Sequence, residues 1–259
     1  MVKPQEAAPS DESVEVRNRT GRGEVLLLCE HAAYDVPARY HGLGLDPAHA
    51  RSHAAWDPGA RAVALLLSEA LDAPLVASRV SRLVYDCNRP PEAESAMPAL
   101  SEVIPVPGNR SLTPEQRQER IDTIYRPFCA AVEEILTARR TAGLPTAVIT
   151  VHSFTPVFHG QKRAVEIGIL HDSDTRLADA ILAEAERIPH RRIRRNEPYE
   201  PADGVTHSLQ LHGIANALHN VMIEIRNDLI ATPDSQAVLA EELLQLIRPA
   251  LDSLRKEER

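Results

Sequence analysis

The stretch Glu24-Val-Leu-Leu-Leu-Cys29 decides the fold, because it places four aliphatic residues and a final cysteine in one unbroken run of strand length. Such a run is typical of a strand buried on both faces of a sheet, as in sheets covered by helices on each side. Three later stretches have the same character, and we expect buried strands there too, at residues 146–151, 164–170 and 221–225.

Helical patterns separate these strands. Residues 113–141 begin with Thr113-Pro-Glu-Gln116, a capping-box signature, and continue with apolar residues at helical spacing. Strands that alternate with helices predict an α/β fold with three layers, in which a mainly parallel or mixed sheet carries helices on both faces. The other expected elements are helices at 58–71, 173–188, 207–218 and from 232 onward, strands at 75–78 and 82–86, and loops at 88–112 and 189–204.

The length and composition indicate a globular protein. We expect a flexible lead-in over residues 1–22 and a single domain over residues 23–259. The net charge of −8 disfavours nucleic acid and anionic membranes as partners, and there is no run of eighteen apolar residues that could span a bilayer. Three widely spaced cysteines do not form a disulfide framework. We therefore expect a cytoplasmic protein that acts on a small molecule; the sequence leaves its oligomeric state open.

Polar clusters follow four of the predicted strands. They are Cys29-Glu-His31, Asp86-Cys-Asn-Arg89, Val151-His-Ser153 and Glu224-Ile-Arg-Asn-Asp228. In open α/β sheets the ligand site lies at the carboxyl ends of the strands. The four segments are therefore expected to meet in one crevice, although no single one of them is a specific motif.

This crevice has the residues of a metal site. Zinc hydrolases usually bind their metal with three His, Asp or Glu ligands. His31 and His152 stand at two strand ends, and Asp57 stands on a loop just before a helix. Glu30 is the reserve candidate, because neighbouring strand residues point to opposite faces and Glu30 and His31 are not expected to bind the metal together.

Glu224 lies inside an apolar run, where an unpaired carboxylate is costly to bury. It is either a general base that deprotonates a metal-bound water, or the ion-pair partner of Arg226 or another arginine. Glu166 has the same local sequence pattern, so the pattern alone does not decide between the two interpretations.

Two further residues have competing interpretations. Arg89 could bind a substrate carboxylate with its planar guanidinium, or it could pair with Asp86 or Glu92. Cys29 could be a nucleophile near His31, but a small buried residue in the first strand is the better interpretation.

Taken in order, the motifs resemble those of the N-formylglutamate amidohydrolase family. The resemblance runs from about residue 24 to residue 250. The first motif differs from the Pro-His-Ser-Gly type of motif in the histidine-pathway members, which indicates a divergent branch of the family. The motifs that carry it are Glu30-His-Ala32, His53-x-x-x-Asp57-x-Gly59, Ser81-Arg-Leu-Val-Tyr-Asp-Cys-Asn-Arg-Pro90, Val151-His-Ser-Phe-Thr-Pro156 and Ile223-Glu-Ile-Arg-Asn-Asp228.

The resemblance implies a fold similar to that of the zinc carboxypeptidases and the hydrolysis of N-formyl-L-glutamate to formate and L-glutamate, a late step of histidine breakdown. It implies one Zn²⁺ held by His31, Asp57 and His152, with Glu224 as the catalytic carboxylate. Asn88 and Arg89 correspond to the pair that holds a substrate carboxylate, and Arg82 is a second possible contact.

Two other classes of function stay open from the sequence. One is a metal-free protein of the same fold that binds a small molecule, and the other is a cysteine hydrolase that uses Cys29. Other N-acyl amino acids also stay open as substrates. The long segment 88–112 is the candidate for a lid over the site.

Overall fold

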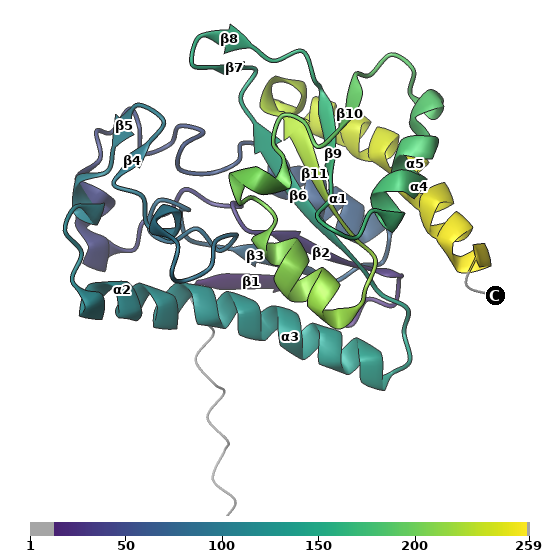
Figure 1. Ribbon diagram of the computed structural model, residues 1–259, viewed down its shortest axis with the longest axis horizontal. Coiled ribbons are helices and arrows are strands. Elements are labelled where there is room, and N and C mark those ends of the chain that lie inside the picture. The colour runs from purple at the N-terminus through teal and green to yellow at the C-terminus, as the bar shows by residue number, and fades with distance from the viewer. Residues whose placement is uncertain (1–12, 258–259) are drawn as a thin grey trace, which may run out of the picture.

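The computed structural model describes residues 13–257 and has one central sheet of seven strands (Figure 1). The strand order is β1-β3-β2-β6-β11-β9-β10. These strands are β1 (Val14–Arg17), β2 (Val25–Cys29), β3 (Leu75–Ser78), β6 (Ala147–Phe154), β9 (Ile167–Leu170), β10 (Ile193–Arg195) and β11 (Asn220–Arg226).

In the described part of the chain, five α-helices and two small ribbons surround this sheet. The helices are α1 (Ala60–Ala70), α2 (Pro114–Arg120), α3 (Arg126–Thr141), α4 (Arg176–Ala183) and α5 (Pro233–Glu257). The ribbons pair β4 (Leu100–Ser101) with β5 (Ile104–Pro105), and β7 (Val157–Phe158) with β8 (Gln161–Lys162). The short helical turns are η1 (Ala38–Gly44), η2 (Glu94–Ala96), η3 (Pro107–Asn109), η4 (Ile121–Tyr125), η5 (Ala185–Arg187), η6 (Pro201–Asp203), η7 (Leu209–Gly213), η8 (Ile214–Asn216) and η9 (Asn227–Ile230).

The sheet is mixed but mainly parallel. Strands β3, β2, β6 and β11 run in one direction, and β1 and the β9–β10 pair run in the other. The buried strand predicted from residues 24–29 forms β2, between β3 and β6. The carboxyl ends of β2, β6 and β11 therefore lie side by side at one edge of the sheet, where the sequence placed the candidate site.

Each face of the sheet carries its own helices, which confirms the predicted three-layer α/β fold. Ile149 and Val151 of β6 pack with α1 and α5 on one face, while Val148 packs with Phe128 of α3 on the other. The turn η7 covers β6 and β11 on this second face (Figure 1). Within residues 13–257, no helix combines the length and the apolar character needed to cross a bilayer.

Three short elements differ from the sequence expectations. Residues 82–86 form a turn instead of a strand, because Ser81 accepts the backbone N–H groups of Leu83 and Val84 and folds the chain back. Strand β1 lies inside the stretch expected to be a flexible lead-in, of which residues 1–12 fall outside the described part of the chain. Strand β10 lies inside an expected loop. Both strands are half-polar edge strands, which give no apolar run to recognise.

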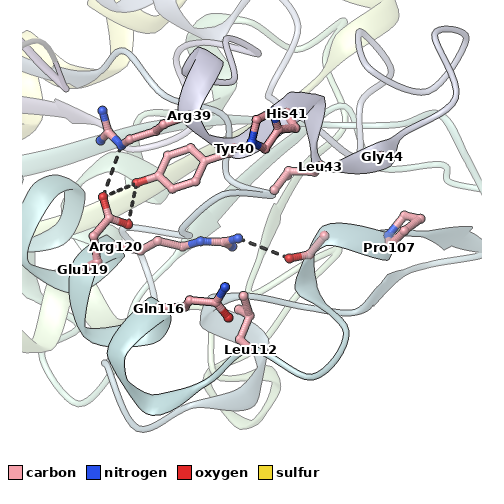
Figure 2. A pocket seen from close by; sticks show the side chains of 11 residues that line it. Arg39, Tyr40, His41, Leu43, Gly44, Pro107, Leu112, Gln116, Glu119 and Arg120 are labelled. Atoms are coloured by element: carbon pink, nitrogen blue, oxygen red, sulfur yellow. Dashed lines mark hydrogen bonds and ion pairs between the residues drawn. The ribbon is translucent and has the colours of Figure 1, made fainter.

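The segment 88–112 is anchored and carries β4, β5, η2 and η3. Asn109 donates to the carbonyl of Leu83, and Arg120 donates to the carbonyls of Val84 and Gly108. Figure 2 shows Arg120 on the wall of a cavity of about 510 Å³ whose lining also includes Tyr40 and Glu119. None of the candidate site residues lines this cavity. The role of the segment as a lid stays a prediction.

Candidate metal centre

His31, Asp57 and His152 come together at the carboxyl edge of the sheet and offer one ligand atom each. The Nδ1 atoms of the two histidines lie 3.1 Å apart, and Oδ2 of Asp57 lies 3.2 Å from His31 Nδ1 and 2.9 Å from His152 Nδ1. All three residues are buried. Ligands of tetrahedral zinc at bond lengths of about 2.0 to 2.1 Å stand slightly more than 3 Å from each other. The three atoms are therefore spaced to hold a small divalent cation.

Backbone contacts fix Asp57 beside the two strand ends. Its N–H donates to the carbonyl of His31, and its Oδ2 accepts the N–H of Ser153. Gly59 then begins α1 with a φ of +83°, and a Cβ there would lie 2.6 Å from the carbonyl oxygen of Ile230. A glycine at this position therefore lets the loop that carries Asp57 pack closely against η9.

A second carboxylate stands behind each histidine. His31 Nε2 lies 2.7 Å from Asp86 Oδ1, and His152 Nε2 lies 3.1 Å from Glu30 Oε2. An ionised carboxylate only accepts, so the hydrogen bond with Asp86 favours the proton on Nε2 of His31, and the charge of Glu30 close to Nε2 of His152 favours a proton there. Both Nδ1 lone pairs then face Asp57, an arrangement typical of histidines that bind a metal.

The cluster carries an excess of buried negative charge. Glu30, Asp57, Asp86 and Glu224 are each at most 5% exposed, and burial of isolated carboxylates is costly. Arg82 balances part of this charge, with Nη2 at 2.8 Å from Asp86 and Nη1 at 3.4 Å from Asp57. This donor set fits a divalent cation.

The same charges act on the histidines when no cation is present. Burial lowers the pKa of His152, but the negative charge of Glu30 and the contact with Asp57 outweigh burial and raise it well above its usual value. Burial raises the pKa of Asp57, but the histidines outweigh it and hold that pKa below its ordinary range.

Glu224 faces the cluster from the neighbouring strand. It pairs in register with His152, and parallel partners project from the same face of the sheet. Its Oε2 has no hydrogen-bond partner within residues 13–257. Burial raises its pKa to about 7, against the charge of His152, and the charge of Asp57 adds to the increase. Glu224 is therefore a buried carboxyl group whose pKa suits proton transfer near neutral pH.

Glu166, the residue with the same sequence pattern, has a structural role instead. Its Oε2 accepts the backbone N–H of Arg192, and its Oε1 lies 3.6 Å from Nη2 of Arg226. Arg226 also pairs with Asp228, so the arginine that could have neutralised Glu224 is engaged elsewhere. The ion-pair interpretation of Glu224 therefore loses its named partner.

The two residues expected to hold a substrate carboxylate are placed differently. The side-chain amide of Asn88 donates to the carbonyl of Val205 and accepts the N–H of Ser208, so it joins two backbone segments. Arg89 donates from Nη1 to the carbonyl of Asn88 and forms no ion pair within the described part of the chain. The Nε and Nη2 groups of Arg89 stay available, whereas the side-chain amide of Asn88 makes these two backbone hydrogen bonds.

Cys29 lies on the other face of the sheet. Its side chain is fully buried among Val25, Leu27 and Ile149. Burial raises the pKa of its thiol well above the ordinary value, and the charges of Asp57 and Glu30 raise it further. A thiol in this environment is a poor nucleophile.

The sequence indicated Asp86 only as a possible ion-pair partner of Arg89, and Glu30 only as a reserve ligand. Asp86 was visible as part of a polar cluster, but its contact with His31 depends on the turn at residues 82–86. Glu30 lies behind His152, on the far side of the ring from Asp57, so its contact marks it as a partner of the histidine.

The chain is similar to known proteins over most of its length. The family model of N-formylglutamate amidohydrolase matches residues 23–231. The chain is 55% identical to gene product Atu2144 from Agrobacterium tumefaciens, with a TM-score of 0.92 over 94% of this chain and 96% of that one. It shares its fold, at 18% identity and a TM-score of 0.66, with the N-formylglutamate amidohydrolase from Ralstonia eutropha JMP134, over 95% of this chain and 99% of that one. No curated protein matches the chain significantly.

Proposed function

Because the chain belongs to the N-formylglutamate amidohydrolase family, we propose that it hydrolyses the amide bond of N-formyl-L-glutamate, or of a closely related N-acyl amino acid, with the help of one bound Zn²⁺. One observation carries the metal dependence: three ligand atoms from His31, Asp57 and His152 stand about 3 Å apart, with Glu30 and Asp86 behind the two histidines. A cation bound there supplies a Lewis acid that polarises the amide carbonyl and acidifies water.

Glu224 would move the proton. As a carboxylate it accepts a proton from the attacking water while the water oxygen adds to the formyl carbon. The resulting carboxylic acid then donates this proton to the amide nitrogen as the C–N bond breaks. The products are formate and the free amino acid. Its position across from His152 and its raised pKa support this role.

Arg82 and Arg89 have distinct expected roles. Arg82 bridges Asp57 and Asp86, so its positive charge lies at the edge of the group of metal-binding residues. There it would help to stabilise the oxyanion that forms when water adds to the amide carbonyl. Arg89 is free of carboxylate partners within residues 13–257 and would hold the α-carboxylate of the substrate. The hydrogen bonds of the Asn88 side chain to the backbone of Val205 and Ser208 would hold the neighbouring Arg89 in position.

Formate release tests the proposed function. The protein is incubated with N-formyl-L-glutamate after removal of metal with a strong chelator, and again after addition of Zn²⁺. We expect no release from the chelated protein and recovery with about one equivalent of zinc. A metal-free binding protein, the competing interpretation, would instead bind the substrate without cleaving it and would retain no stoichiometric zinc. That result would contradict the proposal.

Replacing Arg89 with alanine is expected to raise KM by at least 10-fold, because the loss of one partner of a buried charge pair costs about 2 kcal/mol or more. The zinc content should not change, since Arg89 contacts none of the three ligands. Steady-state kinetics and metal analysis on the same preparation measure both. An unchanged KM would assign Arg89 a structural role.

A further inference from the structure

Arg163 lies in an unusual environment next to the catalytic edge. It follows the β7–β8 ribbon, and its guanidinium carbon lies 4.4 Å from the ring centre of Phe158, 4.9 Å from that of Tyr199 and 5.4 Å from that of Phe154. All three distances are within the range of cation–π attraction. Aromatic faces thus hold this cation in place while the edge of the guanidinium stays free of them.

The guanidinium of Arg163 has one edge without a partner. Its Nη1 donates to the hydroxyl of Tyr199 at 3.1 Å and to the carbonyl of Thr155 at 3.5 Å. Its Nε and Nη2 groups have no hydrogen-bond partner, and no carboxylate pairs with it anywhere in residues 13–257.

Other arginines of this chain show what that edge binds. Arg61 holds Glu15, Arg191 holds Glu242 and Arg226 holds Asp228, each through Nε and Nη2. This pairing of two parallel N–H groups with one carboxylate is the strong, planar form of the interaction. Arg163 presents the same pair of donors with the carboxylate missing.

The aromatic neighbours of Arg163 place it at the catalytic face of the sheet. Phe154 stands two residues beyond His152 on β6, so the two side chains project from the same face and their positions along the strand differ by about 6.6 Å. Tyr199 packs against a small apolar cluster that includes Met222 of β11, and Met222 lies two residues before Glu224 on the same face. The charges of Glu224 and Arg82 both act on the pKa of Tyr199, which burial raises.

From this geometry we infer that Arg163 binds the side-chain carboxylate of an N-acyl acidic amino acid, while Arg89 holds the α-carboxylate. This inference rests on the proposed function and adds a specificity determinant to it. A substrate whose acyl carbon reacts beside His31, Asp57 and His152 would place its side-chain carboxylate several ångströms farther along β6. Arg163 lies in that direction. The enzyme would then select glutamate-like substrates over neutral analogues of the same size.

The test compares two substrates that differ in one charge, N-formyl-L-glutamate and N-formyl-L-glutamine, with the zinc-loaded protein. For the unchanged protein we expect kcat/KM to favour the glutamate substrate by at least about 30-fold, the effect of one well-placed charge pair. In Arg163→Gln this preference should fall to a few-fold, because kcat/KM should decrease for N-formyl-L-glutamate and stay the same for N-formyl-L-glutamine. Calorimetric affinities for L-glutamate and L-glutamine should change in the same way.

Two further variants separate binding from structure. Arg163→Lys keeps the cation but loses the planar pair of donors, so it should fold and lose part of the preference. Arg126→Gln removes an exposed arginine of α3 and should keep the full preference.

The outcomes distinguish the two proposals. An equal loss for both substrates in the Arg163 variants, or a normal enzyme that does not discriminate between them, would overturn the role of Arg163 alone. A protein that cleaves neither substrate would overturn the proposed function and this inference with it.

Discussion

Replacing Glu224 with glutamine is expected to lower kcat by about 10²- to 10⁴-fold, the range that loss of a general acid–base group costs. Glutamine has nearly the same shape but cannot accept a proton from water at neutral pH. The bound zinc should stay at one equivalent, because Glu224 is not among the three ligands. Stopped assays of formate release and metal analysis on the same sample measure the two quantities. A fully active variant would remove Glu224 from the reaction.

The pH dependence provides a control for this prediction. Glu224 must be ionised to accept a proton, so kcat/KM should rise with pH along an acid limb at or below its pKa of about 7, since a bound cation favours the carboxylate. Glu224→Gln should lack this limb in its residual activity. If the limb persists in the variant, it belongs to another group.

The stability of the metal-free protein at different pH values provides a second control, because it depends on the same raised pKa of Glu224. The folded state binds the proton of Glu224 more tightly than the unfolded chain does, so this contribution to stability is present below pH 4.5 and is lost as pH rises to about 7. Glutamine does not titrate, so metal-free Glu224→Gln should lose less stability over this pH range than the unchanged protein. Urea unfolding at several pH values measures the difference.

The fold could be predicted from the sequence because its strands are buried on both faces and therefore read as apolar runs. Strands β2, β6 and β11 all follow this rule, and their carboxyl ends bring His31, His152 and Glu224 together. The edge strands β1 and β10 do not follow this rule and were not predicted, because an edge strand that faces water carries charged residues.

The roles within the site depend on contacts that no local pattern encodes. Glu166 and Glu224 lie in similar apolar runs, yet Arg226 pairs with the first, while Oε2 of the second has no hydrogen-bond partner within the described residues. Likewise, Glu30 and Asp57 are both acidic residues close to a candidate histidine. Which of them faces Nδ1 and which faces Nε2 of His152 is decided by tertiary packing. The sequence could therefore predict the set of residues but not their pairing.

Replacing His152 with alanine is expected to lower the affinity for zinc by more than about 100-fold. The loss of a residue that only supports a metal ligand already costs about 10- to 100-fold, and His152 is itself one of the expected ligands. Formate release should fall with the loss of zinc. The change removes one of three ligand atoms and leaves Glu30, 1% exposed, without the ring that faces it. Equilibrium dialysis against zinc, followed by metal analysis, measures the affinity directly.

The choice of control decides what the His152 result means. Removing one partner of a buried ion pair costs about 3 to 5 kcal/mol, so His152→Ala could lose zinc merely by unfolding. His152→Gln keeps more of the side-chain volume and a polar group near Glu30, and it should fold yet still bind zinc weakly. His212→Ala removes another buried histidine, one that is not in the ligand group, and should keep one equivalent of zinc. Folded His152 variants with normal zinc content would exclude this histidine from the metal site, whereas selective loss of zinc in them, with His212→Ala unaffected, would assign the loss to the missing ligand.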